Sequence, residues 1–145
     1  MKKIYSTLLI IMSLVIFTHC EKHRHGDDHE HGHENSSGAL RLDNGKKWMA
    51  DDITRQTYKG LNKDIRSAQL NDAKAIANFV AAQVKRVNAL IQGCTMKGEA
   101  HNQLHLLIEK TQKDLAAVKK TSPKNIEVVL HDLAKSTALF EKYFE

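Results

Sequence analysis

The sequence predicts an all-α protein, an up-down-up-down four-helix bundle preceded by a signal peptide and a disordered His-rich tail. Two observations predict the bundle. Apolar residues in the C-terminal two thirds of the chain recur at steps of three and four, which is helical spacing, and no stretch has the alternation of a strand. Helix-capping residues stand at or near the start of most of these stretches. Because the connections are short, successive helices should pack antiparallel.

The first 19 residues of the 145-residue chain are expected to be a signal peptide. Two lysines at positions 2 and 3 precede an unbroken apolar run over residues 5–17. A run of this length is too short to span a bilayer as a helix, so cleavage on export is favoured over an interfacial anchor helix. The chain is therefore expected in the cell envelope.

Cys20 has the position of a lipidated cysteine at a lipoprotein cleavage site, although His19 replaces the small residue usual before the cut. Lipidation would anchor a periplasmic or outer-membrane lipoprotein to its membrane. It would also leave Cys94, the second of two cysteines, without an intramolecular partner. A Cys20–Cys94 disulfide is the alternative.

Residues 20–39 are expected to form a disordered tether. Between positions 21 and 38 the sequence has no aliphatic side chain that could offset the entropy of ordering it. Histidines alternate there with Asp and Glu, which predicts a weak and unselective site for Zn, Ni or Cu(II). A solvating spacer is the alternative. The histidines of this secondary tail site are His23, His25, His29, His31 and His33.

Residues 40–145 are expected to form the bundle domain. The first helix should begin after Met49, with Asp51 or Asp52 as its N-cap. Its apolar stripe is Thr54, Tyr58, Leu61, Ile65 and Ala68. Asn71 or Asp72 should cap the second helix. The stripe of that helix steps by four and three through Ala73, Ala77, Val80, Val84, Val87, Ile91 and Cys94.

The third helix should begin near Gly98 and Glu99. Its stripe is His101, Leu104, Ile108, Thr111, Leu115 and Val118. Before the fourth helix, Ser122 and Pro123 form a cap followed by a proline in the first turn. The residues that this helix should bury are Ile126, Val129, Leu130, Leu133, Phe140 and Phe144.

The net charge of +5 does not indicate a nucleic-acid-binding protein. From position 41 onward, 18 Lys and Arg stand against 12 Asp and Glu, spread over the expected helix surfaces without an Arg-rich or aromatic-interleaved stripe. We therefore expect no nucleic-acid partner.

Four metal-ligating residue types fall within twelve positions at the junction of the second and third helices. Cys94 ends the second stripe, Met96 lies in the turn, and His101 and His105 follow one helical turn apart on the third helix. The bundle topology should bring Met49, with neighbouring aromatic residues, to the same end, where it could close over the group. The sequence thus predicts one metal site.

The ligand types indicate the metal. Thiolate and thioether select Cu(I), so Cys94, Met96, His101 and optionally Met49 favour a copper ion. A zinc ion held by Cys94, His101, His105 and a water is the second choice. A purely structural role is the alternative for each residue. Cys94 and His101 would then be core residues, and Met49 and Met96 would fill gaps in the packing.

Two motifs resemble those of small heavy-metal-associated envelope proteins of Bacteroidetes-type bacteria. One is Asn-Gly-x-Lys-Trp at positions 44–48, and the other is Cys-x-Met-x-Gly-x-x-His-x-x-Leu-His at positions 94–105. The resemblance covers most of the chain after residue 40. It implies a helical bundle associated with metals.

These observations predict a metal-binding lipoprotein that acts as a chaperone, buffer or sensor in metal homeostasis, with a component of a metal-efflux system as a candidate partner. The alternatives are a bundle that binds haem non-covalently through His101 and Met49, and a structural or adaptor bundle without a metal. We do not expect an enzyme, because the sequence marks no third group to orient a Cys–His pair.

Overall fold

The computed structural model describes residues 38–145. The expected signal peptide, Cys20 and the tail histidines lie outside these residues. The described part contains α1 (Asp52–Arg66), α2 (Ala73–Gly93), α3 (Gly98–Lys120), a short 3-10 turn η1 (Pro123–Asn125) and α4 (Ile126–Tyr143). Within residues 38–145 no strand is present, only two isolated bridges. The all-α prediction is confirmed.

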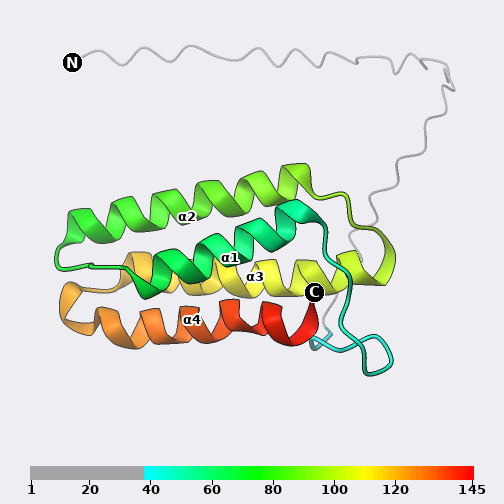
Figure 1. Cartoon of the computed structure of the whole chain (residues 1–145). Helices are drawn as coiled ribbons and strands as arrows, with labels where there is room; N and C mark the ends of the chain where they lie inside the picture. The colour runs from blue at the N-terminus through cyan, green and yellow to red at the C-terminus, as the bar shows by residue number, and fades with distance from the viewer. Residues whose placement is uncertain (1–37) are drawn as a thin grey trace, which may run out of the picture. The chain divides into compact units, whose positions relative to one another are not determined.

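The four helices form the expected up-down-up-down bundle (Figure 1). α1 packs against α2 and α4, and α3 packs against the same two helices, so the four enclose one apolar core. The turn between α2 and α3 therefore lies at the same end of the bundle as the start of α1 and the end of α4 (Figure 1). No helix in the part of the chain that the structure describes is long and apolar enough to cross a membrane.

The caps of the first two helices form as predicted, whereas the predicted cap of the fourth helix does not. The Asp51 carboxylate accepts the Thr54 N–H at the start of α1, and Asp72 accepts the Ala75 N–H at the start of α2. Ser122 precedes the 3-10 turn, but its side chain makes no cap hydrogen bond, and α4 itself starts only at Ile126, after Asn125.

The buried face of α2 differs from the predicted stripe. The helix buries Ile76, Val80, Gln83, Val87 and Leu90, whereas Val84 and Ile91 remain 40% and 44% exposed. The predicted and observed faces share Val80 and Val87, so helical spacing alone does not show which of the two faces is buried. The observed face gains a second long aliphatic chain, and it tolerates Gln83 because the side-chain amide donates to the Asp64 carboxylate at 3.1 Å.

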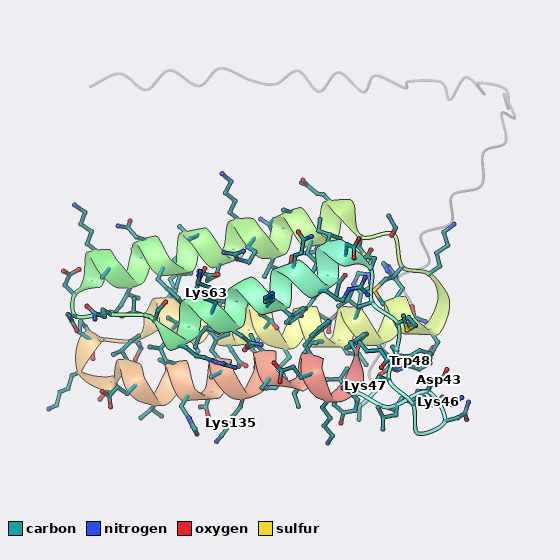
Figure 2. All side chains as sticks on the ribbon, viewed as in Figure 1. Asp43, Lys46, Lys47, Trp48, Lys63 and Lys135 are labelled. Carbon is teal, nitrogen blue, oxygen red and sulfur yellow. The ribbon has the colours of Figure 1, made fainter. Side chains whose placement is uncertain are left out.

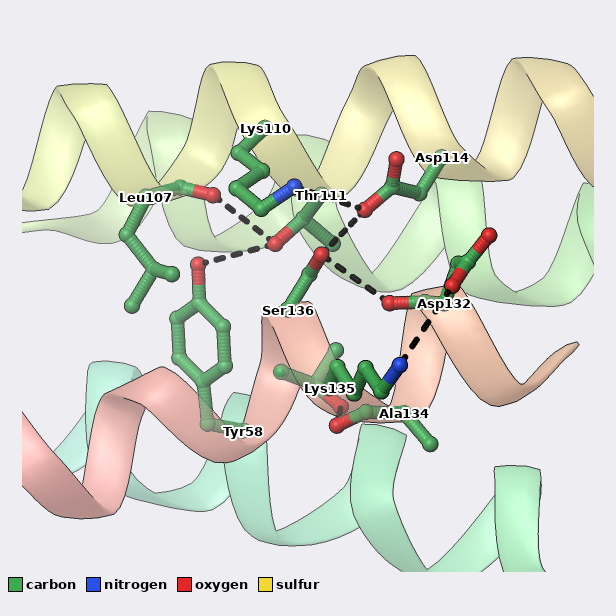
Figure 3. A network of polar contacts seen from close by, with 10 residues as sticks. Tyr58, Leu107, Lys110, Thr111, Asp114, Asp132, Ala134, Lys135 and Ser136 are labelled. Carbon is green, nitrogen blue, oxygen red and sulfur yellow. Dashed lines mark hydrogen bonds and ion pairs between the residues drawn. The ribbon is translucent and has the colours of Figure 1, made fainter. Parts of the chain in front are cut away.

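A polar network joins α3 to α4 and to Tyr58 of α1 (Figure 3). Thr111 donates to the Leu107 carbonyl at 2.8 Å and lies 3.5 Å from the Tyr58 hydroxyl, while Ser136 donates to the Asp114 carboxylate. These hydrogen bonds give the buried hydroxyl groups partners. A buried hydroxyl without a partner would destabilise the fold.

Near the α2–α3 turn, the end of α4 and the residues that follow it are hydrogen-bonded to the segment that precedes α1. The Trp48 N–H donates to the Tyr143 carbonyl at 2.8 Å, and the Glu145 N–H returns to the Trp48 carbonyl at 3.0 Å. The segment that precedes α1 is thereby fixed to the end of α4.

Candidate metal centre

The α2–α3 turn brings Cys94 and His101 together as the sequence predicts. Cys94 follows the last residue of α2 and keeps a helical hydrogen bond from its N–H to the Leu90 carbonyl. Gly98 then begins α3 with φ +62°, a conformation that disfavours other residues. This tight turn leaves the Cys94 Sγ 3.7 Å from the His101 Nδ1.

His105 contacts the opposite nitrogen of the His101 ring. The two Nε2 atoms lie 2.8 Å apart, and the rings meet nearly edge to face with centroids 4.4 Å apart. Cys94 and His105 therefore lie on opposite sides of His101. As the side chains stand, the nitrogen of His101 that faces the thiol is not the one that faces His105.

Met96 shares a neighbour with Cys94. The fully buried Thr54 hydroxyl donates to the Met96 Sδ at 3.7 Å. Thr54 also lies close enough to the Cys94 thiol to act on its pKa, which it lowers against the larger effect of burial. Both sulfur atoms thus lie beside one side chain of α1, which the sequence did not single out as part of the site.

Asp51 fixes the turn to the start of α1. One carboxylate oxygen caps the helix, and the other accepts the Thr95 N–H at 2.6 Å and the Thr95 hydroxyl at 3.0 Å. Partial burial raises the pKa of Asp51, but the hydrogen bonds from Thr54 and Thr95 outweigh it and lower the pKa to about 2. The carboxylate is therefore charged over the physiological range.

The cysteine and the histidine are both held in their neutral forms. Burial raises the pKa of the Cys94 thiol, and the nearby Asp51 charge adds to that effect. Burial also lowers the pKa of His101, as does the neighbouring His105. When the thiol donates to the Nδ1, a neutral His101 carries its proton on Nε2, where His105 can accept it.

Met49 does not occupy the expected position. Its side chain is 66% exposed, so it does not close over the group. Trp48 instead packs against the core and donates from its ring to the Arg41 carbonyl at 2.7 Å (Figure 2). Arg41 in turn contacts Gln103 and pairs with Glu99 at 2.8 Å, so this segment covers the first turns of α3.

The Cys94–His101 separation fits two ligands of one metal ion. Bonds of about 2.3 Å to sulfur and about 2.0 Å to nitrogen at a tetrahedral angle place the ligand atoms about 3.5 Å apart, close to the observed separation. Among residues 38–145, however, no group of three or more His, Cys, Asp and Glu side chains could hold a metal. A third protein ligand from this end of the bundle would have to be the Met96 thioether.

Comparison of the chain with protein-family models, with curated proteins and with solved structures gives no match.

Proposed function

We propose that this chain is a metal-binding protein of the cell envelope that holds one Cu(I) ion through Cys94, Met96 and His101. The observation that carries the proposal is the 3.7 Å contact between the Cys94 Sγ and the His101 Nδ1, which is the separation of two ligands on one metal. The neighbouring thioether adds a second soft sulfur ligand, which favours Cu(I).

Zinc is the second choice of metal. A catalytic or exchangeable zinc site uses three ligands drawn from His, Cys, Asp and Glu. Here His105 would have to leave its contact with the His101 Nε2 to become the third such ligand. The arrangement as it stands suits copper better.

The site suits ion exchange more than permanent storage. Cys94, Met96 and His101 are all partly buried, so an acceptor ligand has access while the core holds the group in place. A chaperone, buffer or sensor anchored through Cys20 would collect ions on the tail histidines and pass one to this site. A component of a metal-efflux system would be the receiving partner.

The contact chain from Cys94 through His101 to His105 also has the connectivity of a thiol nucleophile, a base and an orienting group. The charges argue against that role. Thiol enzymes stabilise a thiolate beside an imidazolium, whereas burial here raises the pKa of Cys94 and lowers that of His101. A metal ion can displace the thiol proton from such a neutral pair.

The haem alternative loses its expected axial pair. Met49 is 66% exposed, so the structure gives less support to a haem held between His101 and Met49 than to a metal between Cys94 and His101. The competing proposal is a structural bundle that binds no metal. In that proposal Cys94 is an ordinary packing residue of the core.

Titration of Cu(I) against a colorimetric Cu(I) chelator under reducing conditions tests the proposal. Cys94→Ser should weaken the tight site by more than roughly 100-fold, since loss of a ligand exceeds the effect of losing an outer-shell partner. Met96→Leu conserves volume and should weaken Cu(I) binding far more than zinc binding. A folded Cys94→Ser protein that binds Cu(I) as tightly as the wild type would leave the structural bundle as the better account.

A further inference from the structure

The imidazole rings of His101 and His105 meet through a nitrogen of His101 that takes no part in the contact with Cys94. The two histidines stand four positions apart on α3, so their side chains lie on one helix face. Their Nε2 atoms lie 2.8 Å apart, and the ring centroids lie 4.4 Å apart. Both side chains are half-buried, so water can reach the pair.

The two separations together indicate where the nitrogen lone pairs point. Two imidazoles bound to one ion at a right angle, with bonds of about 2.0 Å, have their nitrogens about 2.8 Å apart and their ring centroids about 4.5 Å apart. Rotation of either ring about its bond to the ion changes neither distance. A linear N–H···N hydrogen bond of the same length would place the centroids about 5.1 Å apart. The observed pair therefore matches converging lone pairs better than a linear hydrogen bond.

The right angle also indicates the kind of metal. A tetrahedral ion with the same bond lengths would hold the two nitrogens about 3.3 Å apart, whereas neighbouring ligands of a square-planar or octahedral ion meet at about 90°. Imidazole nitrogen in such a geometry suits Cu(II) and Ni(II). Within residues 38–145 no third His, Cys, Asp or Glu completes the group, so water would be the remaining ligand.

The contact with Cys94 suits a metal on the Nε2 of His101. A neutral imidazole that binds a metal through Nε2 keeps its proton on Nδ1, and an acceptor for that proton fixes the tautomer. The Cys94 Sγ lies 3.7 Å from this Nδ1. Burial and the neighbouring His105 lower the pKa of His101, so its ring is neutral near pH 7 and has a lone pair for a metal.

We propose that the Nε2 atoms of His101 and His105 form a second metal site, which binds a divalent ion, Cu(II) or Ni(II), with water as the remaining ligand. The match of both separations to a right-angled pair carries this assignment. The site uses neither sulfur atom, so it does not rest on the proposed Cu(I) site. A neutral His101 has one free lone pair, so it binds one of the two ions at a time.

Urea unfolding of the full chain with and without Ni(II), which a thiol does not reduce, tests the proposal. The tail histidines are expected to bind Ni(II) equally in the folded and unfolded chain, so their contribution cancels. Ni(II) at about ten times its dissociation constant should raise the folding equilibrium constant by roughly tenfold. His105→Ala should lose most of this increase, because a single imidazole cannot chelate. The matched control His131→Ala, which removes an exposed histidine of α4, should retain the increase within about twofold.

Cys94→Ser separates this site from the proposed Cu(I) site. The substitution should weaken Cu(I) binding but retain the Ni(II)-dependent increase within about twofold, because the serine hydroxyl can still accept the Nδ1 proton. Each variant without Ni(II) is its own reference, so a change in basal stability does not affect the comparison. The proposal would be overturned by no increase in the wild type, by an increase that survives in His105→Ala, or by loss of the increase in Cys94→Ser, which would assign Ni(II) to the thiol.

Discussion

His101 is the residue on which the candidate site depends, because its two ring nitrogens face two different partners. The Nδ1 faces the thiol at 3.7 Å, and the Nε2 lies 2.8 Å from the Nε2 of His105. Histidine ligands commonly donate their second nitrogen to an outer partner that fixes the tautomer and the ring orientation. His105 is placed to be that partner.

We therefore expect His105→Ala to lower Cu(I) affinity by roughly 10- to 100-fold while the stoichiometry stays at one ion, as removal of an outer-shell partner does. His105→Gln, which can still accept the proton, should retain most of the affinity. The measurement is the chelator competition titration. Loss of the site in His105→Ala to the same degree as in His101→Ala would make His105 a direct ligand.

The sequence predicted this group of residues better than it predicted their roles. Cys94 and His101 meet because both fall on the core register at one hairpin, which helical spacing reveals. The contact of His105 with the Nε2 of His101 depends on ring orientation, which spacing does not determine. Thr54 and the second contact of Asp51 come from another helix, so only the tertiary structure shows them.

At the scale of the elements, Asp51 joins the start of α1 to the turn that carries the site. Asp51→Ala should destabilise the domain by about 1 kcal/mol or more, since it removes an N-cap and the two Thr95 contacts together. Asp51→Asn can still cap and should cost less. Urea unfolding followed by circular dichroism measures both.

The pH dependence follows from the low pKa of the Asp51 carboxylate. Its folded pKa of about 2 lies below the value of about 3.9 for an unfolded aspartate. The charged cap therefore stabilises the fold above about pH 4, and this contribution is lost as the pH falls from about 4 to about 2. A stability difference between wild type and Asp51→Asn that stayed constant over this window would contradict the assignment.

The orientation of α2 is the part of the fold that the sequence predicted least well. The 4-3 spacing is satisfied by two overlapping faces, and side-chain size and the Gln83–Asp64 contact decide between them. Helix number, order, antiparallel packing and the caps of α1 and α2 depend on local signals and short connections, so these were predictable.

Adjacent substitutions test that orientation. Leu90 is fully buried, so Leu90→Ala should cost about 2–5 kcal/mol of unfolding free energy. Ile91 is 44% exposed, and Ile91→Ala should cost well under about 1 kcal/mol. Chemical denaturation of the two variants gives the comparison, and a reversed order would restore the predicted stripe.

At the scale of the whole molecule, the sequence predicts two metal-binding parts with separate properties. Deletion of residues 21–38 should leave helical content and unfolding of the bundle unchanged, because that tract has no aliphatic side chains to contribute to a core. It should lower the total Zn or Ni capacity and retain one tight site. Circular dichroism and equilibrium dialysis measure these two outcomes. If the deletion abolished the tight site, the tail and the bundle would form one metal site together, which would contradict the prediction of two separate parts.

X-ray absorption at the copper edge tests the central claim most directly. With less than one equivalent of Cu(I) under reducing conditions, the account predicts sulfur scatterers at roughly 2.3 Å, from Cys94 and Met96, and one nitrogen at roughly 2.0 Å from His101. Cys94→Ser should reduce the sulfur contribution in a folded protein. A spectrum of the wild type with nitrogen and oxygen neighbours alone would assign the copper to the tail histidines and contradict the site at the α2–α3 turn.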